Sequence, residues 1–155
     1  ELLRYLRTSY LHVSYERVLS GPGLHLIYQF LRDTQKNEPT WFSEKLPTGD
    51  PTSLIAKAGL EGKPDICKNA LQLFVSIYGA EAGNMALKAL AMGGVYIGGG
   101  IAPKILPAFQ DGTFMKSFLA KGRYKRLLGK IPVRVILNPH TALLGAASVA
   151  ASMKP

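Results

Sequence analysis

The sequence predicts an α/β fold, because short strand-like runs alternate with segments whose apolar residues recur at helical spacing. The strand-like runs are residues 13–20, 93–100 and 133–137. Glycine, proline and polar clusters separate them from the helical segments and mark turns. This alternation predicts a sheet covered by helices. Three strands are few for such a sheet, so we expect the chain to be part of a larger structure.

The first part of the chain predicts a helix, a strand and a second helix. Residues 1–10 have the pattern of the middle or end of an amphipathic helix with no N-cap residue, which we interpret as a truncation. Residues 13–20 (VSYERVLS) predict a strand that ends at a Ser-Gly-Pro-Gly turn signal. Residues 24–34 then predict a helix, because their apolar side chains recur three or four positions apart.

The next segment is less regular. Residues 35–51 are polar and contain three helix- or strand-breaking residues, Pro39, Pro47 and Gly49, so they predict a loop. Residues 52–59 predict a short helix capped by Thr52.

Residues 64–92 form the longest periodic segment and predict one long helix. Pro64 suits its first turn. Gly79 and Gly83 lie inside it, and glycine at each position costs a helix about 1 kcal/mol relative to alanine. We expect close backbone packing against a neighbouring element to offset that cost.

The remaining chain predicts strand, helix, strand and helix. Residues 93–100 (GGVYIGGG) are a short apolar strand with glycine at both ends, and residues 103–109 begin a new helix. A further strand at 133–137 (VRVIL) precedes an alanine-rich helix at 141–153.

Composition restricts the class of protein. With 155 residues, 47% hydrophobic and 19% charged, the chain has the size and balance of one soluble domain. Its single cysteine, Cys67, excludes an intrachain disulfide and fits a cytoplasmic location. The apolar stretches end well short of the ~20 residues that a membrane helix needs. We therefore expect no membrane partner.

The formal charge of +9 comes largely from one basic segment, residues 116–130, which contains no acidic residue. A basic segment can bind nucleic acid, but such modules usually add interleaved aromatic residues or a helix-turn-helix pattern. We interpret the segment as a solvated helical face beside an anionic substrate site, and we expect no nucleic-acid partner.

Several common site motifs are absent. Gly62-Lys63 is followed by Pro64, which breaks the phosphate-loop pattern, and Pro103 stands where a dinucleotide fingerprint requires glycine. No G-x-S-x-G nucleophile elbow occurs. The histidines and the cysteine lack metal-ligand spacing, so we predict no metal site: His12, His25, His140 and Cys67.

Two features remain as candidate sites. Gly98, Gly99 and Gly100 follow a predicted strand and precede a helix, where residues without Cβ let a flat ligand lie against the backbone. The carboxyl end of a strand in an open α/β sheet is a usual ligand site, and helix N–H groups can hold phosphate or ribose oxygens. Glu16 lies near the end of the first predicted strand, where its carboxylate can accept hydrogen bonds from two neighbouring sugar hydroxyls.

The sequence resembles the C-terminal half of the bacterial glucokinase family, within the hexokinase and actin-like ATPase superfamily. The resemblance covers nearly the whole chain and is weakest over residues 35–63. It implies that residues 1–155 are a partial large C-terminal lobe of a ribonuclease H-like sugar kinase, without the N-terminal lobe. Five segments carry it in the family's order: HVSYERVLSGPGL (12–24), GGVYIGGGIAP (93–103), KGR (121–123), IPV (131–133) and LLG (143–145).

The resemblance implies a function for both candidate sites. It implies ATP-dependent phosphorylation of glucose on its 6-hydroxyl, with Mg²⁺, as the first step of glycolysis in a cytoplasmic homodimer. Glu16 matches the glutamate that holds the sugar. Gly98, Gly99 and Gly100 match the glycines on the adenosine side.

Other motifs of that family do not occur in these 155 residues. They are the N-terminal phosphate-binding glycine loop, the Asn-Asp pair whose aspartate is the catalytic base, and the Glu-x-x-His sugar motif. We therefore expect the catalytic aspartate in a missing N-terminal part and predict that the isolated chain is inactive. Cys67 alone also argues against the related branch with a cysteine-rich zinc motif.

Two other functions stay open at this point. One is a non-catalytic domain that binds sugar or nucleotide. The other, which we favour least, is a nucleic-acid-binding module that uses the basic segment 116–130.

Overall fold

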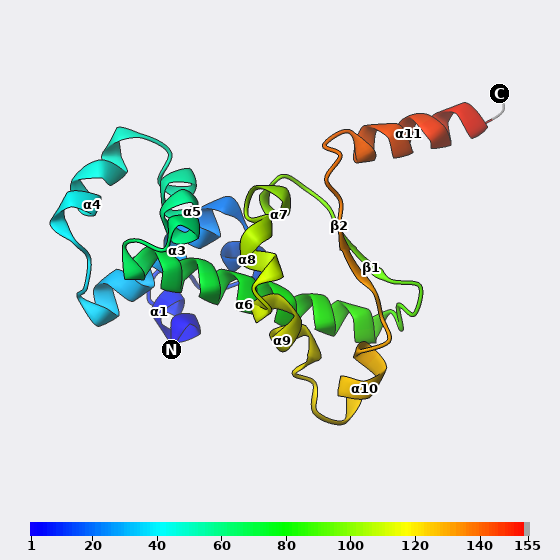
Figure 1. The fold of residues 1–155 in the computed structure, drawn as a ribbon, viewed down its shortest axis with the longest axis horizontal. Helices are drawn as coiled ribbons and strands as arrows, with labels where there is room; N and C mark the ends of the chain where they lie inside the picture. Colours follow the sequence, from blue (N-terminus) through cyan, green and yellow to red (C-terminus); the bar gives the residue numbers. More distant parts are fainter. Residues whose placement is uncertain (154–155) are drawn as a thin grey trace.

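A computed structural model describes residues 1–153 (Figure 1). Helices dominate the described chain, and short turns connect most of them. Their order along the chain is α1 (Leu2–Arg7), α2 (Tyr15–Val18), α3 (Gly21–Gln35), α4 (Thr40–Lys45), η1 (Leu46–Thr48), α5 (Pro51–Glu61), α6 (Asp65–Lys88), β1 (Val95–Ile97), α7 (Ile101–Lys104), α8 (Leu106–Gln110), α9 (Thr113–Leu119), η2 (Gly122–Tyr124), α10 (Lys125–Leu128), β2 (Val133–Val135) and α11 (Thr141–Ser152).

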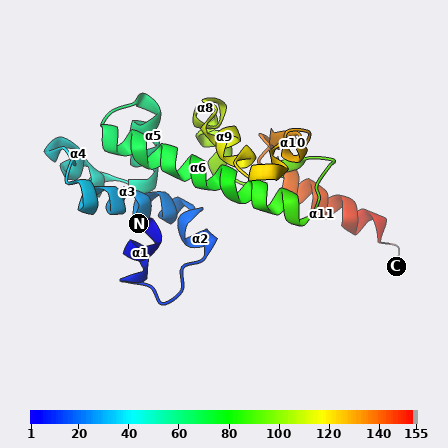
Figure 2. The ribbon, with the colours of Figure 1, turned by 90° about the horizontal axis from the view of Figure 1, so that it is seen from below.

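Helix α6 runs through the middle of the molecule, and the other elements pack along it (Figures 1 and 2). Helices α3 and α5 contact it on one side, and α9 makes the most extensive contact with it. The fully buried side chains along these interfaces are mostly aromatic or branched, and they include Tyr28, Phe74, Phe114 and Phe118. Removal of this apolar surface from water is the main term that holds the helices together.

The two glycines of α6 allow its backbone to approach α9. A Cβ atom on Gly79 would lie 2.2 Å from the carbonyl oxygen of Phe114, and one on Gly83 would lie 2.6 Å from that of Phe118. The predicted close packing is therefore confirmed, and α9 is the neighbouring element.

Strands β1 and β2 form a parallel pair, with Val95 opposite Val133 and Ile97 opposite Val135; within residues 1–153 the sheet has these two strands. The chain crosses from one to the other through α7, α8, α9 and α10, as parallel pairing requires a long connection. The even positions Tyr96 and Arg134 are exposed on the face opposite the core.

The prediction of a strand at residues 13–20 is wrong. Ser14 caps α2 by accepting a hydrogen bond from the amide of Arg17 at 3.3 Å. Ser20 caps α3 in the same way, accepting from the amide of Gly23 at 3.1 Å. These two serine caps stabilise helix starts within a β-prone run, so capping chemistry prevails over strand propensity here.

The structure differs from the sequence prediction in three further elements. The predicted loop 35–51 contains α4 and η1. Helix α5 is capped by Asp50 and not by Thr52, whose hydroxyl instead donates to the carbonyl oxygen of Gly21 at 2.9 Å. The helix predicted at 103–109 is divided into α7 and α8, because Pro107 has no N–H to donate within a continuous helix.

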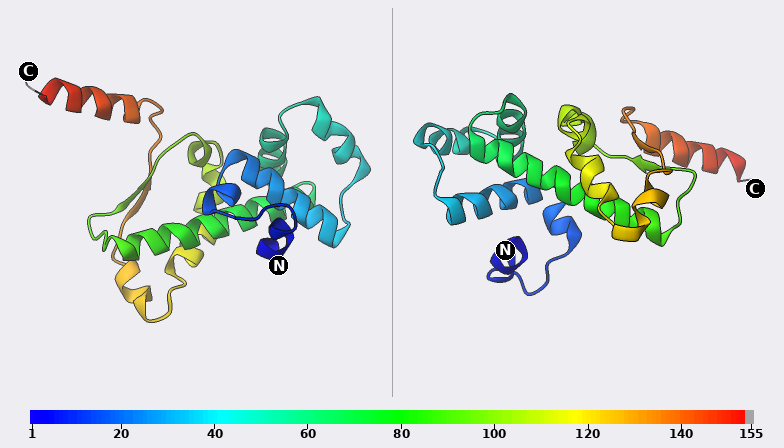
Figure 3. Two further views of the ribbon diagram at one scale, coloured as in Figure 1. Left: turned by 180° about the vertical axis from the view of Figure 1, so that it is seen from behind. Right: turned by 60° about the horizontal axis from the view of Figure 1, so that its bottom comes forward.

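Helix α11 extends away from the body of the molecule (Figures 1 and 3). Its side chains are exposed throughout, including the apolar Leu143, Leu144 and Val149. In the described part of the chain, helices that combine the length and the apolarity needed to cross a membrane are absent.

Replacing Gly79 with alanine should destabilise the fold by about 3 kcal/mol, because the new Cβ overlaps the Phe114 carbonyl oxygen and α9 must move. Gly145, inside α11, is a matched control, since a Cβ added there has no atom within 4 Å. Its replacement with alanine should leave stability unchanged or raise it by up to about 1 kcal/mol. Denaturant unfolding of both variants measures the difference, and equal midpoints would contradict the backbone contact.

Cys67 should be inert in the folded protein. It is fully buried, and burial raises the pKa of its thiol to about 12, with a smaller contribution from the negative charge of Glu38. Because the thiolate is the reactive form, a thiol reagent at pH 8 should label Cys67 only after denaturation. Rapid labelling of the native protein at the rate of the unfolded chain would overturn this placement.

Candidate functional site

Three cavities adjoin one another along the side of the molecule formed by α2, α3, α5 and α7. We name them the Glu16 cavity, about 510 Å³, the central cavity, about 620 Å³, and the glycine cavity, about 520 Å³. Ser20 and Pro22 line both the Glu16 and central cavities. Gly100 and Lys104 line both the central and glycine cavities. The shared residues place the three cavities next to one another in a row, which we call the depression, with the two sequence-predicted sites at its ends.

Glu16 lies in the first turn of α2, directly after the Ser14 cap. Helix α2 has only four residues, so its dipole adds little to the stability of the carboxylate. The guanidinium group of the neighbouring Arg17 lies 4.1 Å from the centre of the Tyr10 ring, and this cation–π contact holds the Arg17 side chain in place. Glu16 is exposed to the cavity, and Tyr10 and Arg17 form part of the same wall.

His25 projects from α3 into the Glu16 cavity and is half-buried. Burial lowers the pKa of its imidazole, and the positive charge of Arg32 lowers it further, while the charge of Asp50 acts in the opposite sense. The imidazole is therefore neutral at pH 7, with one nitrogen able to donate and the other to accept. From the sequence, His25 was considered only as a metal ligand, and nothing in its spacing pointed to this cavity.

The glycine run follows β1 directly, as expected for a ligand site at the carboxyl end of a strand. Gly99 has a φ of +98°, which L side chains rarely adopt. Nothing lies within 4 Å of a Cβ placed on Gly99 or Gly100, so the backbone there faces open space. The helix that follows, α7, has only four residues, and its dipole contributes correspondingly little.

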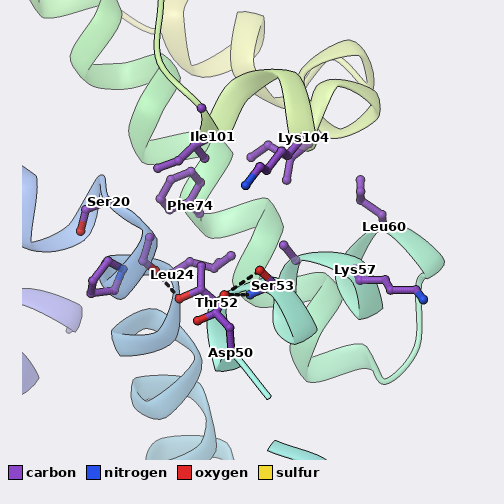
Figure 4. Close-up of a pocket in the computed structure, with 15 residues that line it drawn as sticks. Ser20, Leu24, Asp50, Thr52, Ser53, Lys57, Leu60, Phe74, Ile101 and Lys104 are labelled. Atoms are coloured by element: carbon purple, nitrogen blue, oxygen red, sulfur yellow. Dashed lines mark hydrogen bonds between the residues drawn. The ribbon is translucent and has the colours of Figure 1, made fainter. Parts of the chain in front are cut away.

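The central cavity has apolar walls and a polar rim (Figure 4). Phe74 of α6 and Ile101 of α7 lie on one wall, and Leu24 of α3 lies across from them. At the rim, one oxygen of Asp50 accepts bonds from the amide of Ser53 at 2.9 Å and from its hydroxyl at 2.6 Å.

Sequence reasoning missed Asp50, Ser53 and Lys104. Asp50 precedes Pro51 in a recognisable helix-start pattern, and Lys104 follows the glycine run by four residues. Neither signal shows that the two residues line one cavity, because α5 packs on α6, whereas α7 contacts α8, which in turn contacts α6.

The basic segment 116–130 does not line any of the three cavities. The prediction that this segment lies beside the substrate site therefore gains no support from these cavities. One member, Lys121, donates instead to the side-chain carbonyl of Asn84 at 2.7 Å and so joins α6 to the end of α9.

Metal ligands do not gather in the described residues. Within 1–153, no group of three or more His, Cys, Asp or Glu side chains is placed to hold a metal ion.

Comparison with known proteins gives a consistent result. The family model described as Glucokinase matches residues 1–153. A glucokinase of Nostoc sp. is 47% identical over 99% of this chain and 49% of its own length. A glucokinase of Neisseria gonorrhoeae is 40% identical over 94% of this chain and 42% of its own length.

A solved structure agrees in fold. The crystal structure of a glucokinase from an Antarctic psychrotroph superposes with a TM-score of 0.82 at 29% identity, over 98% of this chain and 45% of that one. The α/β class and the match to part of a sugar kinase are therefore confirmed. The chain spans about half the length of the curated relatives it matches, and it belongs to the glucokinase family.

Proposed function

We propose that the protein to which this chain belongs transfers a phosphoryl group from ATP to the 6-hydroxyl of glucose. The observation that carries this proposal is the depression with Glu16 at one end and Gly98–Gly100 at the other. A kinase must hold an acceptor and a donor next to each other, because phosphoryl transfer is mostly positioning and charge neutralisation. Membership of the glucokinase family supports the assignment of glucose and ATP.

In this proposal Glu16 holds the sugar. An ionised carboxylate accepts hydrogen bonds only, and its two oxygens match two neighbouring hydroxyl groups. Because the charge strengthens each bond, the pair fixes both the position and the rotation of the sugar ring. Ser14 contributes by fixing the start of α2, which determines where the Glu16 side chain begins.

Gly98, Gly99 and Gly100 are proposed to lie against the adenosine part of ATP. Side chains are absent there, and open space surrounds the Cβ positions of Gly99 and Gly100. A planar base or a ribose can therefore approach the backbone closely. The apolar wall formed by Phe74, Ile101 and Leu24 offers a surface of the kind that bases pack against.

Catalysis requires groups that these residues do not supply. The family motifs for the base and for the phosphate loop do not occur in residues 1–155, so we assign no catalytic residue to this chain. Mg²⁺, when bound, neutralises charge on the phosphates during transfer. We assign none of residues 1–153 to it. The isolated chain is accordingly expected to bind ligands without turnover.

We also propose that the protein is a cytoplasmic homodimer. The support is the family resemblance together with a single, buried cysteine, which suits a reducing compartment. Light scattering on the purified full-length protein measures the mass, and a monomer at micromolar concentration would contradict this part of the proposal.

The sharpest test is a steady-state assay of the full-length protein with glucose, mannose, fructose and N-acetylglucosamine. Wild type should prefer glucose, and Glu16→Gln should reduce kcat/KM for glucose by roughly 100-fold, because charge-assisted bonds to the sugar are lost. Glu44→Gln is the matched control, since Glu44 is an exposed helical glutamate that lines none of the three cavities. It should retain wild-type activity.

Two results would count against this proposal. Equal activity of Glu16→Gln and Glu44→Gln would remove Glu16 from the sugar site. A folded wild-type protein that phosphorylates none of these sugars, yet binds glucose or ATP, would favour the alternative of a non-catalytic binding domain.

A further inference from the structure

Helix α3 has two different faces. One face is buried where α3 contacts α5 and α6, and its residues are apolar or aromatic: Leu24, Ile27, Tyr28 and Leu31. The other face lines the Glu16 cavity, and its residues also recur three or four positions apart: Pro22, His25, Leu26 and Gln29. Residues at this spacing lie on one side of a helix. Burial of the first face therefore turns the second face toward the cavity.

Another wall of this cavity is α2, which carries Glu16. The two helices meet at backbone contact, since a Cβ atom on Gly23 would lie 2.1 Å from the carbonyl oxygen of Val18. This contact fixes the separation of the two helix backbones. Side chains that enter the cavity from α2 and from α3 therefore begin at fixed positions, as a selective site requires.

His25 and Gln29 have polar groups that the protein itself does not use. Within residues 1–153 neither side chain takes part in a hydrogen bond or an ion pair. The same residues contain no fully buried side-chain nitrogen or oxygen without a partner. The ring nitrogens of His25 and the amide of Gln29 are therefore accessible, at the cavity that both residues line.

These groups complement the carboxylate of Glu16. A carboxylate only accepts hydrogen bonds, whereas each sugar hydroxyl both donates and accepts. The neutral imidazole of His25 and the amide of Gln29 each supply a donor and an acceptor from a second wall. Most residues that line this cavity are polar, in contrast to the apolar walls of the central cavity. The combination suits a ligand with several neighbouring hydroxyl groups.

We propose that His25 and Gln29 form hydrogen bonds with hydroxyl groups of the sugar that Glu16 holds, and that they determine which hexose the cavity accepts. Hexose epimers differ in the direction of one hydroxyl group. A donor or acceptor fixed on α3 meets that hydroxyl in one epimer and is left unpaired with the other, which disfavours the wrong sugar. This inference rests on the proposed function and adds two specificity-determining residues to it.

The test is a steady-state assay of the full-length protein with glucose and three analogues that lack the hydroxyl group at C2, C3 or C4. His25→Phe keeps a ring and removes both nitrogens. It should lower kcat/KM for glucose about 10-fold, mainly through KM, because the contact is the same before and during phosphoryl transfer. With the analogue that lacks the contacted hydroxyl, the same substitution should lower kcat/KM less than about 2-fold.

Three further variants separate recognition from structure. His12→Phe is the matched control, since His12 is exposed, lines none of the three cavities and should leave kcat/KM unchanged. His25→Gln restores a donor and an acceptor, so its kcat/KM for glucose should lie within about 3-fold of wild type. Gln29→Met removes the amide at similar length and should change the preference for glucose over mannose about 3-fold.

Wild-type kinetics in both His25→Phe and Gln29→Met would overturn this inference. An equal loss by His25→Phe with glucose and all three analogues would also overturn it, because a structural role does not depend on one hydroxyl. If Glu16→Gln loses activity while the two α3 variants do not, the proposed sugar site stands and this inference fails.

A calorimetric measurement of glucose binding covers the case in which the full-length protein phosphorylates no sugar. Weaker binding of glucose by His25→Phe than by His12→Phe would then support the contact from α3 although the proposed function had failed. Equal binding by the two variants, or no binding of glucose by wild type, would overturn the inference.

Discussion

The contact between α6 and α9 is the constraint on which the rest of the structure depends. Gly79 and Gly83 let the two helices approach until their backbones touch, which no other residue type would permit. This approach places Phe114 and Phe118 fully inside the core, next to one another and close to Tyr78. The energy gained by burying these rings outweighs the cost of two glycines within a helix of 24 residues.

The same helix also determines where the cavities lie. The N-terminal half of α6 packs against α3 and α5, which carry the rims of the Glu16 and central cavities. Phe74 belongs at once to the buried core and to the cavity wall. The central cavity is therefore built against the longest helix of the described chain, and polar residues at the surrounding helix starts form its rim.

Helix caps connect local sequence to the site. Ser14, Ser20 and Asp50 each satisfy free amides at a helix N-terminus, and each lines a cavity. The residue proposed to hold the sugar lies close to a cap, since Glu16 follows Ser14 by two positions. Cap geometry is precise, so a ligand that contacts these residues meets groups whose positions are already determined.

Sequence alone predicted those elements whose signal is periodic. The long helix over 64–92 and the helix after Ser20 were recovered, because a buried face repeats along them. The two strands around 95 and 133 were recovered as short apolar runs between glycine and proline turn signals. The strand prediction for residues 13–20 was wrong. The β-branched and aromatic residues of this segment are typical of a strand, but its two serines cap helices in the structure. Glu16 and the glycine run were predicted as candidate sites from their local pattern and from the family resemblance, and both stay predictions. The place of Lys104 depends on the packing of α7 against α8.

If the protein binds ATP as proposed, its positive charge acts on the nucleotide at two ranges. A formal charge of +9 raises the local concentration of any anion, but salt screens such attraction beyond about 8 Å at physiological ionic strength. The basic segment 116–130 lines none of the three cavities, so it can contribute to encounter and not to the bound geometry. A cation inside the depression can add to the affinity for a bound phosphate. Among the residues that line its central part, Lys104 is the one whose amino group faces inward and remains available.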